Sequence, residues 1–174
     1  MKAALPLAVI LLLAVAACDK AKPRPAAAAD AAATAMAGEP TLAPPASVGL
    51  AKRPEMAAFS LDLINDAADP LNKPARIKSG VPTTFSGFGF DPIAKTPGKA
   101  IDIVIDGVPY GTTYGSARPD VAAYNKAPAV QPSGFRITLP AGTVTPGPHQ
   151  VVVRVVTADG KSYFDSLILS FHAE

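Results

Sequence analysis

The residue best suited to covalent chemistry is Cys18, the only cysteine in a chain of 174 residues. A thiol can act as a nucleophile, bind a metal, form a disulfide or carry a lipid. Without a second cysteine, an intramolecular disulfide is excluded. Cys18 ends an N-terminal segment in which Lys2 precedes fifteen residues, 3–17, that are apolar throughout. This layout is typical of a secretory signal, and it is shorter than the roughly 20 apolar residues of a membrane-spanning helix.

The four residues Val15-Ala16-Ala17-Cys18 resemble the bacterial lipobox. The resemblance implies cleavage after residues 1–17 and a diacylglyceryl group on Cys18, with N-acylation of the new terminus. Two or more acyl chains anchor a protein stably, so we expect a mature chain held on the membrane without a transmembrane helix. Asp19 resembles the residue that retains lipoproteins in the inner membrane, which favours the inner over the outer membrane. The alternative is an unmodified cysteine after an ordinary signal.

Residues 18–56 are predicted to be a disordered linker that carries the lipidated cysteine. The stretch after Cys18 is rich in Ala and Pro, has scattered charges and contains no aromatic residue. Such a composition buries too little apolar surface to offset the roughly 1–2 kcal/mol that ordering each backbone residue costs. We therefore expect the folded domain to span residues 57–174 and to be held away from the bilayer.

The most distinctive polar group in that domain is Arg118-Pro119-Asp120, with Tyr124 four residues further on. Two interpretations are open. Arg118, Asp120 and Tyr124 could hold a ligand at the end of a loop. Alternatively, Asp120 could cap a single helical turn over residues 121–124, with Pro119 fixing its start and Arg118 paired with a nearby acid.

No catalytic or metal-binding pattern is found. His149 follows a Pro-Gly-Pro turn and is expected at a turn or at the start of a strand, and there is no paired-histidine motif or nucleophile elbow. Calcium ligands could come from aspartates, although no EF-hand spacing exists. These aspartates are Asp62, Asp66, Asp69, Asp91, Asp102 and Asp106. We predict no cofactor, no metal and no enzymatic activity.

The charge balance argues against nucleic acid as a partner. The whole chain has a formal charge of +2, but residues 57–174 contain ten Lys and Arg against ten Asp and Glu. A nucleic-acid surface needs clustered basic residues. Tryptophan is absent and aromatic residues make up 6% of the chain, which removes the usual stacking platform for sugars. Four tyrosines leave a carbohydrate-binding role open, and their positions are Tyr110, Tyr114, Tyr124 and Tyr163.

Alternating apolar residues after residue 57 predict short strands, with turn residues between them. Asp106-Gly107 and Asp159-Gly160 each indicate a tight turn, and the second should join two strands that pair directly. About seven strands within residues 57–174 indicate an all-β fold, an antiparallel sandwich. The predicted strands are 59–63, 77–81, 83–90, 100–105, 134–139, 150–157 and 162–171.

Five segments in order resemble Ig-like modules of bacterial envelope and secreted proteins. They are residues 85–92, 103–107, 114–124, 134–135 and 147–151. The resemblance implies a single Ig-like β-sandwich and is nearly silent on activity. Together with the lipobox it leads us to expect a cell-envelope lipoprotein that faces the periplasm and presents a non-catalytic binding or structural module. Its partner would be an envelope protein or glycan. The alternative is an accessory carbohydrate-binding domain or a subunit of an envelope enzyme complex.

Overall fold

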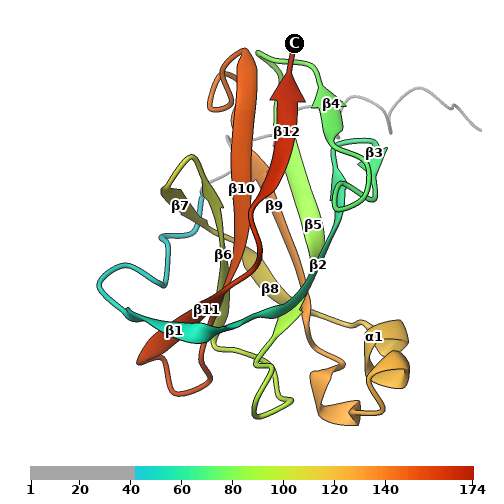
Figure 1. Ribbon diagram of the computed structural model, residues 1–174, viewed down its shortest axis with the longest axis vertical. Coiled ribbons are helices and arrows are strands. Elements are labelled where there is room, and N and C mark those ends of the chain that lie inside the picture. Colours follow the sequence, from blue (N-terminus) through green and yellow to red (C-terminus); the bar gives the residue numbers. More distant parts are fainter. Residues whose placement is uncertain (1–41) are drawn as a thin grey trace, which may run out of the picture. The chain divides into compact units, whose positions relative to one another are not determined.

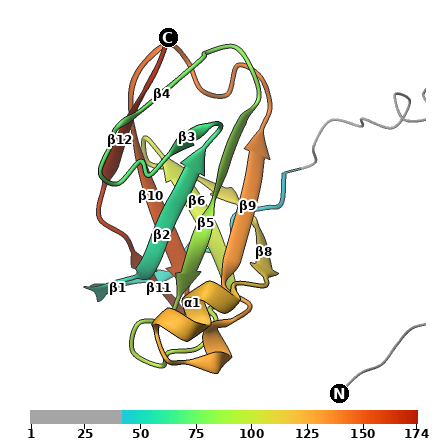
Figure 2. The same ribbon diagram turned by 90° about the vertical axis from the view of Figure 1, so that its right-hand side faces the viewer.

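Two β-sheets packed face to face form the part of the protein that the computed structural model describes, residues 42–174 (Figures 1 and 2). The predicted all-β sandwich is confirmed. One sheet has five strands in the order β3-β2-β5-β9-β8, and the other has seven. The strands are β1 Ala51–Met56, β2 Ala58–Ile64, β3 Ala67–Ala68, β4 Ala75–Ile77, β5 Thr83–Phe90, β6 Ala100–Ile105, β7 Val108–Gly111, β8 Thr113–Ser116, β9 Gly134–Leu139, β10 Gly147–Val156, β11 Ser162–Asp165 and β12 Leu169–Ala173.

Strand β10 is the centre of the seven-stranded sheet. It pairs with β6 along one edge and with β12 and then β11 along the other, all antiparallel. The expected final strand 162–171 is thus split in two. Ser166 lies at the break, and its bonds to Val153 of β10 take the place of the strand-to-strand backbone bonds. Its N–H donates to the Val153 carbonyl and its hydroxyl accepts from the Val153 N–H, each at 2.9 Å.

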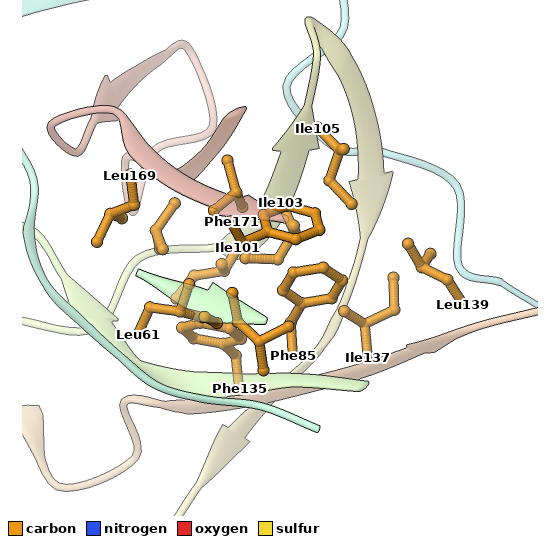
Figure 3. Packing of buried hydrophobic residues seen from close by; sticks show 14 of the residues in the cluster. Leu61, Phe85, Ile101, Ile103, Ile105, Phe135, Ile137, Leu139, Leu169 and Phe171 are labelled. Carbon is orange, nitrogen blue, oxygen red and sulfur yellow. The ribbon is translucent and has the colours of Figure 1, made fainter. Parts of the chain in front are cut away.

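The core lies between the two sheets. It is made by alternate residues along the strands, whose side chains point inward. Phe85 of β5 meets Phe171 of β12 edge to face, with ring centroids 5.8 Å apart, so this pair joins the two sheets (Figure 3). Ile101 and Ile103 of β6 are fully buried beside them. Burying each side chain of this size contributes about 1.5–3 kcal/mol. A smaller cluster of Phe90, Val121 and Val130 lies apart from this core.

The predicted boundary at residue 57 is wrong, because residues 42–56 belong to the fold. Residues 42–50, which we call the strap, cross the outer face of the seven-stranded sheet. The buried Asp102 carboxylate of β6 accepts the backbone N–H groups of Ala46 and Ser47 at 3.0 and 2.8 Å. Gly111 bridges to Ala43, and an added Cβ at Gly111 would stand 2.5 Å from the Pro44 carbonyl oxygen. Backbone N–H groups bound to a buried carboxylate, together with Leu42 packed against the core, thus order a segment of linker-like composition. Residues 18–41 of the expected linker lie outside the described residues.

Two further features differ from expectation. The described region has twelve strands instead of about seven, and two pairings are parallel, β1 with β11 and β4 with β12. The strands beyond the expected seven are β1, β3, β7 and β8, together with the division of 162–171 into β11 and β12. They are short and carry no long apolar alternation. A helix, α1 Pro119–Tyr124, and a 3-10 turn, η1 Pro128–Val130, cover one end of the five-stranded sheet (Figure 2). No helix within residues 42–174 is long and apolar enough to cross a membrane.

Candidate functional site

Two of the residues singled out from the sequence, Cys18 and Asp19, lie outside the described residues. Their expected roles in lipid attachment and sorting stay predictions.

Arg118 joins α1 to the five-stranded sheet. Its guanidinium donates to both Asp120 oxygens, the shortest bond being 2.7 Å from Nη2, and its Nη1 donates to Asp62 of β2 at 2.8 Å. The same group lies 5.1 Å from the centroid of the Phe88 ring. These bonds to Arg118 hold the pKa of Asp120 at about 2. Arg118 is therefore already occupied by two carboxylates and an aromatic face.

The structural interpretation of this loop is correct in part. Pro119 begins the helix and Arg118 pairs with nearby acids, as expected. Asp120 does not cap the helix, because its carboxylate is turned to Arg118 and no side chain provides a cap bond. Tyr124 lies at the far end of α1 with 88% of its surface exposed, and its hydroxyl makes no hydrogen bond within residues 42–174. The structure thus brings Arg118 and Asp120 together and leaves Tyr124 apart.

A more open site lies on the outer face of the five-stranded sheet, the face turned to the viewer in Figure 2. Leu63 of β2, Ser86 of β5 and Arg136 of β9 stand in one row across the sheet, in register. The segments 65–67 and 76–81 border this row. Together they enclose a groove of about 580 Å³. It is lined by Leu63, Asn65, Asp66, Ala67, Arg76, Ile77, Lys78, Val81, Thr84, Ser86 and Arg136.

The groove is positively charged, with three cationic side chains and one carboxylate among its lining residues. Arg76 reaches Glu174 at 3.3 Å, a pair whose side chains are 74% and 58% exposed and which therefore contributes little. For Lys78 and Arg136, no carboxylate of residues 42–174 lies within ion-pair distance. The groove combines two cations open to a ligand with an apolar side formed by Leu63, Ile77 and Val81.

Sequence reasoning missed this groove. The alternation of the strand 134–139 was sufficient to place Arg136 on the outer face, opposite the buried Phe135 and Ile137. Arg76 and Lys78, however, come from a strand of the other sheet, β4 and the residues after it. Only the tertiary packing of β4 beside β3 brings these charges to the groove.

His149 lies near the start of β10, as expected, but it is buried and bound on both sides of its ring. Nδ1 is 2.6 Å from Asp106 and Nε2 is 2.7 Å from the Thr145 carbonyl oxygen, while the ring stacks on Phe171. Burial alone would lower the pKa of His149, but the bonds to Asp106 and Thr145 outweigh it and raise the pKa. With both ring nitrogens taken by acceptors, His149 is a structural group in this arrangement.

The remaining sequence candidates are dispersed. Within the described part of the chain no three His, Cys, Asp or Glu side chains are grouped so that they could hold a metal ion. The four tyrosines lie on β7, β8, α1 and β11 and form no row on one sheet face. The Tyr114 hydroxyl is engaged with backbone, donating to the Gly89 carbonyl and accepting from the Gly98 N–H.

Comparison with known proteins leaves the groove to be interpreted on its own geometry. No protein-family model, curated protein or solved structure matches this chain.

Proposed function

We propose that the protein is a lipoprotein of the bacterial cell envelope, anchored in the membrane by lipidated Cys18 and facing the periplasm. Its Ig-like β-sandwich would act there as a non-catalytic binding module. The observation that carries the binding role is the open cationic groove on the five-stranded sheet, where Lys78 and Arg136 have no carboxylate partner among residues 42–174. A large, concave site with a few convergent polar groups is the usual form of a binding site.

The strap supports the anchored arrangement. In a chain anchored at Cys18, the residues that follow would connect the membrane to the strap, which begins at Leu42. The Asp102 carboxylate fastens the strap to the seven-stranded sheet. The groove lies on the outer face of the other sheet. The tether would join the sandwich beside Arg136, because Leu42 and Ala43, the first residues of the strap, line a second hollow together with Arg136.

The test of the anchor is intact-mass analysis and membrane fractionation of the protein expressed with its own signal in a Gram-negative host. We expect a wild-type chain that begins at residue 18, carries added acyl chains and sediments with membranes. In Cys18→Ala the acyl mass and the membrane association should both be lost. The matched control is Asp19→Asn, which should keep the lipid and change only the distribution between inner and outer membranes. An unmodified, soluble wild-type chain would contradict the proposal.

A further inference from the structure

We propose that the groove on the five-stranded sheet binds a small polyanion, a molecule with at least two carboxylate or phosphate groups, with Arg136 as its principal contact. This inference rests on the proposed function, because it takes the sandwich to be a binding module. It adds the chemical class of the ligand.

The position of Arg136 is the first reason. Arg136 stands between Ser86 of the central strand β5 and Thr113 of the edge strand β8, its partners in register on the two neighbouring strands. A guanidinium fork matches the two oxygens of a carboxylate or phosphate, and a hydroxyl beside it can donate a further bond. Ser86 provides that hydroxyl, since the hydroxyl bonds near the groove are made by Ser79, Thr83 and the Thr84–Thr138 pair and leave Ser86 without a hydrogen bond within residues 42–174.

The charges around Arg136 are the second reason. Arg76 and Lys78 come to the groove from the β4 side, while Asp66 is its only acidic lining residue. Three cations facing one carboxylate at a partly enclosed surface attract anions and repel cations. Lys78 and Arg136 have no carboxylate partner among residues 42–174, so each can bind one oxyanion group. This favours a ligand with two such groups over a monoanion.

The size and lining of the groove exclude other classes. Its volume of about 580 Å³ falls within the roughly 300–1,000 Å³ of small-molecule sites. None of its lining residues is aromatic, so sugars and nucleobases have no stacking surface there. The apolar side formed by Leu63, Ile77 and Val81 suits the carbon skeleton that joins two oxyanion groups.

The experiment is calorimetric titration of the purified full-length chain, in a non-ionic detergent, with three probes. Citrate represents carboxylates, pyrophosphate represents phosphates and xylitol is the uncharged control. We expect binding of citrate, pyrophosphate or both, and none of xylitol. Binding should weaken as ionic strength rises from about 0.01 M to about 0.1 M, because the screening length falls from about 30 Å to about 10 Å. Which anion binds distinguishes a carboxylate from a phosphate ligand.

The decisive variant is Arg136→Gln. Loss of a charged hydrogen bond should weaken binding about tenfold or more, whereas Arg136→Lys should retain part of the affinity. The control is Lys161→Gln, which removes one positive charge from the turn between β10 and β11, at the opposite end of the sandwich from β3 and β4 (Figure 1). Its affinity should be unchanged. Circular dichroism spectra that match the wild type would show that the variants are folded.

The inference is overturned if neither anion binds, if xylitol binds as well as the anions, or if Arg136→Gln and Lys161→Gln reduce binding equally. Each of these results would leave the Cys18 mass and fractionation test unaffected. Conversely, anion binding by a chain that carries no lipid would support the groove and contradict the anchor. The failures of the two proposals are therefore distinguishable.

Discussion

At the scale of single residues, His149 shows how hydrogen bonds favour the charged form of a buried ring. Asp106 and the Thr145 carbonyl are both acceptors, so both ring nitrogens must carry protons for both bonds to exist. Burial raises the pKa of Asp106, but the Gln150 N–H and His149 outweigh it and lower that pKa. Asp106 also begins the turn into β7 with a positive φ of 48°. One ion pair thus connects the β6–β7 turn to the start of β10.

We predict that this pair makes stability depend on pH. The folded-state pKa of His149 is raised, so its contribution is complete below the unfolded value of about 6.5 and is lost as the pH rises above it. The pKa of Asp106 is lowered, so its contribution is lost as the pH falls below about 3.8. The difference in unfolding free energy between wild type and His149→Gln, measured by denaturant titration, should be largest at about pH 5–6 and shrink towards pH 9.

The control for this prediction is His172→Gln, an exposed histidine on β12. Its difference from wild type should stay small, because the side chain is exposed. A His149→Gln difference that grew above pH 7 would show that the neutral ring is the stabilising form, contrary to the bonding described.

At the scale of elements, the strap depends on one side chain. Asp102 interrupts an otherwise apolar strand, and its carboxylate is fully buried beneath residues 42–50. A buried carboxylate is costly unless it is hydrogen-bonded, and here it receives two backbone N–H groups. The strap in turn gains its fixed path from these bonds and from the missing Cβ at Gly111.

We predict that Asp102→Asn lowers the free energy of unfolding by about 1–3 kcal/mol, because one buried N–H then faces an amide NH₂ and loses its acceptor. Denaturant titration measures the loss, and limited proteolysis should show faster cleavage within residues 42–50. Asp66→Asn is the matched control, since Asp66 is exposed, and its effect should stay within about 0.5 kcal/mol. Equal stability of the two variants would mean that the strap is held by other contacts.

At the scale of the whole molecule, the two sheets are held together by their shared core. With a single cysteine in the chain, no disulfide within the chain supports the sandwich. Phe85 and Phe171 come from different sheets and are 0% and 2% exposed. Their edge-to-face contact adds to the area that each buries.

We predict that Phe85→Ala costs about 3–5 kcal/mol, a large part of the roughly 5–15 kcal/mol of a typical domain. Thermal unfolding followed by circular dichroism should show a strongly lowered midpoint. Leu71→Ala, at a side chain that is 48% exposed, is the control and should shift the midpoint little. A small shift for Phe85→Ala would show that the sheets do not depend on this contact.

Much of the fold could be predicted from residue patterns. Strands β5, β6 and β9 have the predicted bounds, and β2 exceeds its prediction by one residue at each end. In β5 the buried residues alternate, because the core covers only one face of this strand. In β6 they run continuously, because the core covers one face and the strap covers the other. Strand β1 could not be predicted, since all six of its residues are exposed and its pairing with β11 is supported by backbone bonds.

The sequence by itself determined the local facts: an apolar segment that ends at the only cysteine, the alternating strands, and the tight turn at Asp106-Gly107, both of whose residues have positive φ. These depend on neighbouring residues alone. Only the tertiary structure decided that Asp102 holds the strap, that Asp62 joins Asp120 on Arg118, and that Arg76 and Lys78 line a groove with Arg136. Each of these joins residues distant in the chain, and their meeting depends on how the two sheets pack.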